Sequence, residues 1–79
     1  MRGSRWSDLE VVRYTRHARD QMALRRISET EVEEVIRRHH THYADRNGND
    51  IYVGHPGGRR VKVVVAKNTD PSLVITAAD

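Results

Sequence analysis

The chain has 79 residues, a formal net charge of +3 and no cysteine. This length allows one domain with a thin core, and the lack of cysteine excludes a disulfide framework, thiolate catalysis and cysteine-based zinc sites. Twelve of the fourteen basic residues are arginine, which suits phosphate and stacks on bases, although solvated helix faces would give the same composition.

Residues 1–79 are expected to form one domain, with residues 1–9 as a flexible leader. No apolar run approaches the roughly 20 residues of a membrane span, and no signal-peptide pattern is present. We therefore expect a cytoplasmic protein that has no membrane partner. Cores of this size supply only a few kcal/mol, so a partner protein or a homo-oligomer is a physical expectation.

The first half of the chain predicts a short strand and then a helix. Residues 10–14 are β-branched and aromatic, as strands tend to be. Thr15 is the expected N-cap of a helix that runs to about Arg26. Ala18 and Met22, four residues apart, lie on the apolar side of this helix.

A second helix is predicted to begin with a capping box, in which Ser28 and Glu31 satisfy each other's backbone amides. Acidic residues precede basic ones along it, in agreement with the helix dipole. Its buried face is expected to comprise Val32, Val35, Ile36 and His39.

From about residue 41 the apolar period becomes two, which is typical of strands. Polar turn clusters separate strands at about 43–45, 51–55, 59–67 and 73–77. The sequence therefore predicts an α+β domain in the order β-α-α-β-β-β-β, with two N-terminal helices packed on a four-stranded antiparallel meander sheet.

Alternation assigns the strand side chains to two faces of the sheet. The helix-covered face is expected to hold Val61, Val63, Val65, Leu73, Ile75, Ile51 and Val53. The open face is expected to hold Val74 and, beside it, Tyr52, Arg60, Lys62 and Thr76. Two cations, a phenol and a hydroxyl form a phosphate-binding set, while an ordinary solvated sheet face would also be polar.

Five histidines are candidates for chemistry, because imidazole transfers protons near neutral pH. His17 lies in the first turn of the first predicted helix, where it is either a base or acid or a structural surface residue. The others are His39, His40, His42 and His55. Three imidazoles can bind zinc, but neighbouring histidines at a helix end point in different directions, so we expect no metal site and no cofactor.

One pattern runs through HARDQM at 17–22, RIS at 26–28, VEEV at 32–35 and the strand segments 58–64 and 73–76. With this pattern the chain resembles a family of small bacterial domains of unknown function. The resemblance covers roughly residues 11–77. That family is similar to BrnT and to RelE/ParE-type toxins, within the barnase–EndoU–colicin–RelE group of metal-independent ribonucleases.

The resemblance implies a RelE-like toxin domain, with RNA as substrate and a cognate antitoxin protein as partner. By position, His17 matches the histidine that opens the family's first helix, and Arg26 matches the arginine before its second helix. Arg59 or Arg60 matches the basic residue that enters the central strand, and Thr76 matches the polar residue of the last strand.

Metal-independent RNA cleavage needs a base for the 2′-OH, an acid for the leaving 5′ oxygen, and cations for the phosphate. The predicted catalytic residues are His17, Arg60 and Thr76. The predicted RNA-binding residues are Arg26, Arg59, Lys62 and Tyr52. If the helices cover one face and Thr76 lies on the other, His17 would reach it only around an edge of the sheet.

A different class of function is also open. The same fold could serve as a non-catalytic RNA-binding module that uses the arginines and the open face. It could equally be a protein-interaction module whose sheet edge pairs with a partner strand or with itself.

Overall fold

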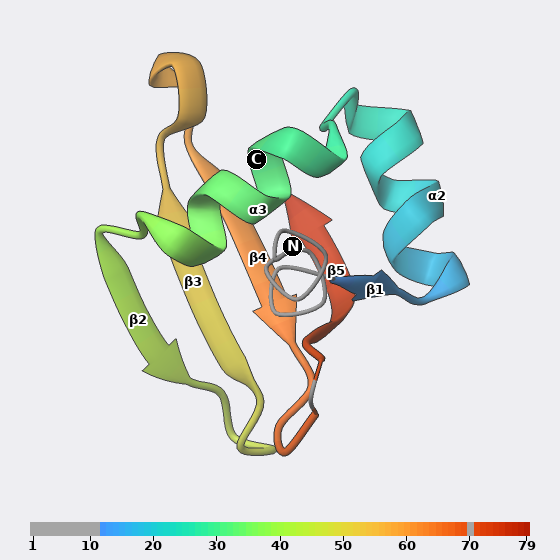
Figure 1. Cartoon of the computed structure of the whole chain (residues 1–79), viewed down its shortest axis with the longest axis vertical. Coiled ribbons are helices and arrows are strands. Elements are labelled where there is room, and N and C mark those ends of the chain that lie inside the picture. The colour runs from blue at the N-terminus through green and yellow to red at the C-terminus, as the bar shows by residue number, and fades with distance from the viewer. Residues whose placement is uncertain (1–11, 70) are drawn as a thin grey trace, which may run out of the picture.

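The computed structural model describes residues 12–69 and 71–79, so the leader predicted at 1–9 lies outside the described residues. Two helices cover one face of a five-stranded mixed sheet (Figure 1). The elements in chain order are β1 (Arg13–Tyr14), α2 (Arg16–Arg25), α3 (Glu29–Arg37), β2 (Thr41–Ala44), β3 (Asp50–Gly54), the 3-10 turn η1 (Pro56–Gly58), β4 (Val61–Val65) and β5 (Leu73–Ala78). No helix within the described stretches is long and apolar enough to cross a membrane.

The sheet confirms the α+β class but corrects the predicted meander of four antiparallel strands. Its strand order is β1-β5-β4-β3-β2, and the four later strands are antiparallel neighbours. β1 joins the sheet as a fifth strand, parallel to β5, with Tyr14 opposite Val74. Because β1 and β5 lie far apart in the sequence, no turn residues between them predict this pairing.

Both helices begin at the predicted caps. The Thr15 side chain accepts a hydrogen bond from the Ala18 amide at 3.1 Å. Ser28 and Glu31 form the full capping box, with bonds of 3.1 Å and 2.8 Å between each side chain and the other's amide. These side chains satisfy amides that a helix start leaves free, so the local sequence decides where each helix begins.

Weaker sequence signals mark the ends of the two helices than their starts. α2 ends at Arg25, and the residue that caps it, Arg26, adopts the left-handed conformation (φ 56°) that more often belongs to glycine. α3 ends at Arg37, earlier than predicted. His39 therefore lies beyond the helix and is exposed, so its predicted place on the buried helix face is wrong.

The core lies between the two helices and the covered face of the sheet. Its buried members are Ala18, Met22, Ile27, Val32, Val35, Val61, Val63, Val65, Val74 and Ala77. The inward positions predicted for the three valines of β4 are confirmed.

The faces predicted for β3 are reversed. Tyr52 pairs with the core residue Val63 and so faces the helices. Ile51 and Val53 pair with residues of β4 that point away from the helices. Both are only 7% exposed, so their apolar character reflects burial and does not identify the helix side.

β5 departs from the predicted alternation because its pairing with β4 shifts register between Val64 and Val65. The shift places Val74 opposite the core residue Val65 and fully buries it. The core positions predicted for Leu73 and Ile75 are therefore wrong, and both residues are only partly buried. Such an irregularity inserts a residue and changes which side chains face inward.

Candidate functional site

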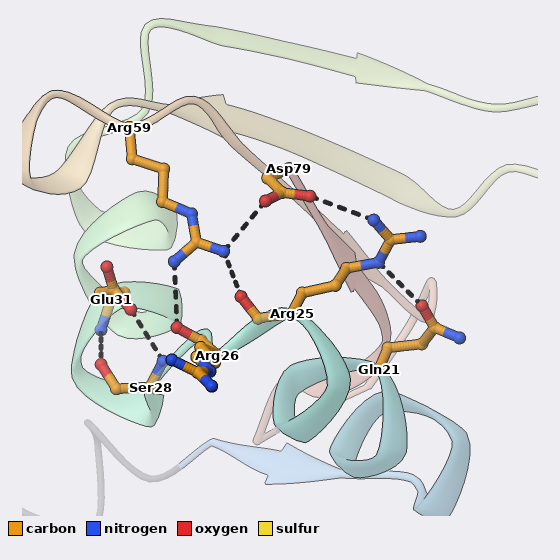
Figure 2. A network of polar contacts seen from close by, with 7 residues as sticks. All are labelled: Gln21, Arg25, Arg26, Ser28, Glu31, Arg59 and Asp79. Carbon is orange, nitrogen blue, oxygen red and sulfur yellow. Dashed lines mark hydrogen bonds and ion pairs between the residues drawn. The ribbon is translucent and has the colours of Figure 1, made fainter.

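An arginine network joins the end of α2 to the end of β5 (Figure 2). Arg59 donates to the backbone carbonyl of Arg25, to that of Arg26 at 3.0 Å, and to the Asp79 carboxylate at 3.0 Å. Arg25 donates to the other Asp79 oxygen at 3.1 Å. Arg59 thus satisfies carbonyls that the end of a helix leaves free, and this structural role competes with the RNA contact predicted for it.

The network is expected to make stability depend on pH. Hydrogen bonds from Arg59 and then Arg25 hold the pKa of the Asp79 carboxyl below its ordinary value of 3.8. A lowered folded-state pKa gives stability that is complete above the unfolded-state value and is lost as the pH falls through the folded-state value. Asp79→Asn should therefore lower the melting temperature near neutral pH, and its difference from wild type should be smaller at a pH below 3.8, the ordinary pKa of the group. Thermal melts at the two pH values test this, and a difference that stays constant would contradict it.

His17 is exposed in the first turn of α2 and is not brought to Arg60. The Thr15 amide, just before this helix, donates to the Val74 carbonyl at 3.0 Å, near the start of β5. Arg59, which precedes Arg60, contacts the other end of the same helix. A ten-residue helix is about 14 Å from its first to its last residue, so the geometry does not support a single site that contains both residues.

Lys62 and Thr76 do share a surface, on the sheet face that points away from the helices. Lys62 pairs with Ala78 and Thr76 pairs with Val64, which makes the lysine and the threonine diagonal neighbours on adjacent strands. Arg60 is exposed just before β4, on the same side by alternation. We call these three residues the β4–β5 surface; Tyr52, predicted to belong with them, lies on the opposite face.

Tyr52 belongs instead to a group of rings beside the C-terminal end of α3. Its ring stacks on His42, with centroids 4.6 Å apart and planes at 8°. His39 lies 4.8 Å from Tyr52 and 5.7 Å from His42. We call these three residues, with Asp50, the ring cluster.

Asp50 completes the ring cluster through a 2.9 Å contact with Nε2 of His42. Burial, followed by the charge of Asp50, raises the pKa of Tyr52, so its phenol is neutral at physiological pH. The alternation of β2 and β3 contains the signal for this cluster, but only the hairpin register places His42 opposite Tyr52. Sequence reasoning considered the histidines only as metal ligands, expected no metal site, and did not assemble them this way.

The remaining predicted residues form no further site. His40 and His55 contact each other, with centroids 5.0 Å apart, outside the ring cluster. Arg26 is exposed, and its carbonyl accepts from Arg59. Across residues 12–69 and 71–79, no three histidine or carboxylate side chains are arranged to hold a metal ion.

Comparison with known proteins identifies one family. A family model described as a domain of unknown function, DUF4258, matches residues 14–79. No similar curated protein and no similar solved structure is found. The resemblance to a small family of unknown function is confirmed, and the likeness of that family to BrnT and RelE/ParE toxins stays a prediction.

Proposed function

The chain belongs to the DUF4258 family, and we propose that it is a toxin-type domain that binds RNA in the cytoplasm and cleaves it without a metal ion. The observation that carries the proposal is the β4–β5 surface. Lys62 and Thr76 are neighbours there, and Arg60 lies at its end. Neither strand contains an acidic residue, so the surface can approach phosphate without repulsion.

The proposal includes an antitoxin protein as partner. β2 (Thr41–Ala44) is an edge strand, and all four of its residues are exposed. An edge strand presents unpaired backbone groups, to which a partner strand can add. A small core also gains stability from a partner, which fits a domain that is held inactive in a complex.

A non-catalytic RNA-binding module is the second candidate, and a specific observation favours it. His17, the predicted base or acid, lies at the far end of α2 from Arg60 and on the other side of the sheet from Thr76. The predicted catalytic set is therefore not assembled, whereas the phosphate-binding set of Lys62, Arg60 and Thr76 largely is.

Lys62→Ala is expected to weaken RNA binding, and Lys67→Ala, which removes an exposed lysine from the turn after β4, is the matched control. Loss of one phosphate contact should reduce the slope of log affinity against log salt by about 0.7 for single-stranded RNA. Fluorescence anisotropy with a labelled oligonucleotide at several salt concentrations measures both slopes. Equal slopes for the two variants would show that Lys62 does not contact phosphate.

Incubation of the same RNA with wild-type protein and a chelator separates the two candidates. Cleavage that persists with the chelator supports the nuclease. Intact RNA, together with salt-dependent binding through Lys62, favours the non-catalytic module.

A further inference from the structure

We propose that the ring cluster of His39, His42, Tyr52 and Asp50 is the acid–base site of this domain, acting on a phosphodiester that carries a neighbouring 2′-OH. This inference rests on the proposed function, because it assigns residues to the RNA cleavage step. It places the chemistry on the helix side of the β2–β3 hairpin, away from His17 at the start of α2 and on the opposite face from the β4–β5 surface. An RNA strand that contacts both must therefore pass around the edge of the sheet at β2.

The two histidines present different free nitrogens. Nδ1 of His39 lies 3.0 Å from the Ile36 carbonyl oxygen, and a carbonyl can only accept, so Nδ1 carries a proton. Nε2 of the neutral ring is then a free base. Nε2 of His42 contacts the Asp50 carboxylate at 2.9 Å and must donate to it. The free nitrogen of His42 is therefore Nδ1, which is a proton donor when that ring is charged.

The arrangement of the rings brings the two imidazoles close together. The His39 and His42 centroids are 5.7 Å apart, with planes at 62°, so one phosphate group can contact both. Tyr52 touches both rings and limits their rotation. The His42 side chain is 43% exposed and His39 is also exposed, which leaves the pair open to a substrate as large as RNA.

These positions allow the two histidines to act as base and acid in cleavage of the phosphodiester. Nε2 of His39 takes the proton of the 2′-OH, and the 2′ oxygen forms a bond to phosphorus. The bond between phosphorus and the 5′ oxygen breaks, and Nδ1–H of His42 protonates that oxygen. The products are a 2′,3′-cyclic phosphate and a free 5′-OH, and proton exchange with water returns both rings to their starting states.

Asp50 and Tyr52 are positioning residues in this account. Asp50 fixes the tautomer of His42, as carboxylates do for catalytic histidines in general. Asp50→Asn should lower kcat and leave KM unchanged, because the amide can present a donor to Nε2 and so favour the other tautomer. A change in KM alone would show that Asp50 acts only on RNA binding or on local structure.

The decisive experiment compares histidine variants in cleavage of a fluorescent RNA oligonucleotide with EDTA present. His39→Ala and His42→Ala should each reduce the rate by about 10²- to 10⁴-fold, with RNA affinity and melting temperature unchanged. His40→Ala is the matched control, since it removes a neighbouring exposed imidazole that lies outside the cluster. His40→Ala should cleave at the wild-type rate.

The outcomes separate this inference from the function on which it rests. Wild-type cleavage that survives His39→Ala or His42→Ala overturns the ring cluster and leaves the nuclease proposal standing. RNA left intact by the wild type overturns both. If an alanine variant has a lowered melting temperature, His39→Gln and His42→Gln replace it, because glutamine keeps a polar side chain. The glutamine variants are expected to show the same loss of rate as the alanine variants.

Discussion

Met22→Ala is expected to leave a large part of the protein unfolded at physiological temperature, whereas Leu24→Ala should be almost neutral. Both residues lie on α2, but Met22 is 5% exposed in the core and Leu24 is 75% exposed. Truncation of a buried methionine to alanine costs about 2–5 kcal/mol. A domain of this size rarely holds more than about 3–5 kcal/mol of stability, so the first substitution removes most of it.

Chemical denaturation followed by circular dichroism measures this difference directly. The free energy of unfolding should fall steeply for Met22→Ala and stay close to wild type for Leu24→Ala. Equal losses for the two variants would contradict the orientation of α2, in which Ala18 and Met22 face the sheet.

Gly54→Leu is expected to force α3 away from β3, and Gly54→Ala is the matched control. A Cβ atom at Gly54 would lie 3.5 Å from both Cα and Cγ2 of Val35, which is ordinary contact for alanine but leaves no room for a longer side chain. Overpacking of this kind costs typically about 1–3 kcal/mol. Val35 is 1% exposed, so the helix cannot give way without disturbing the core.

The same substitution should also affect activity if the ring cluster is the catalytic site. α3 carries the Ile36 carbonyl that orients His39, so displacement of the helix would release that ring. Melting temperature and RNA cleavage should both fall for Gly54→Leu and stay near wild type for Gly54→Ala. Equal melting temperatures for the two variants would mean that α3 is not held against Gly54.

The sequence predicts what local chemistry decides. Thr15 and Ser28 mark the helix starts, because each hydroxyl accepts a hydrogen bond from a backbone amide only three residues further along the chain. The inward valines of β4 follow from alternation alone. The parallel pairing of β1 with β5 and the register shift beside Val65 depend on contacts between distant segments, and no local pattern contains them.

The candidate site divides in the same way. The face of Lys62 follows from alternation beside the confirmed inward valines of β4. The prediction for Thr76 starts from inward positions of Leu73 and Ile75, which the register shift overturns, although Thr76 itself keeps the expected face opposite Val64. The partnership of His42 with Tyr52 needs the β2–β3 register, and the contact of His39 with both needs the early end of α3. Arg59 shows the reverse case: the family resemblance implies an RNA contact, whereas in the fold its guanidinium binds the carbonyls at the end of α2.

The most direct test of the central claim is end-group analysis of RNA incubated with the purified protein and a chelator. Cleavage by attack of the 2′-OH requires new ends that carry a 2′,3′-cyclic phosphate and a 5′-OH, at a rate that the chelator does not change. Ends that carry a 5′-phosphate and a 3′-OH, or cleavage that the chelator abolishes, would contradict metal-independent attack by the 2′-OH. RNA that stays intact would contradict cleavage altogether.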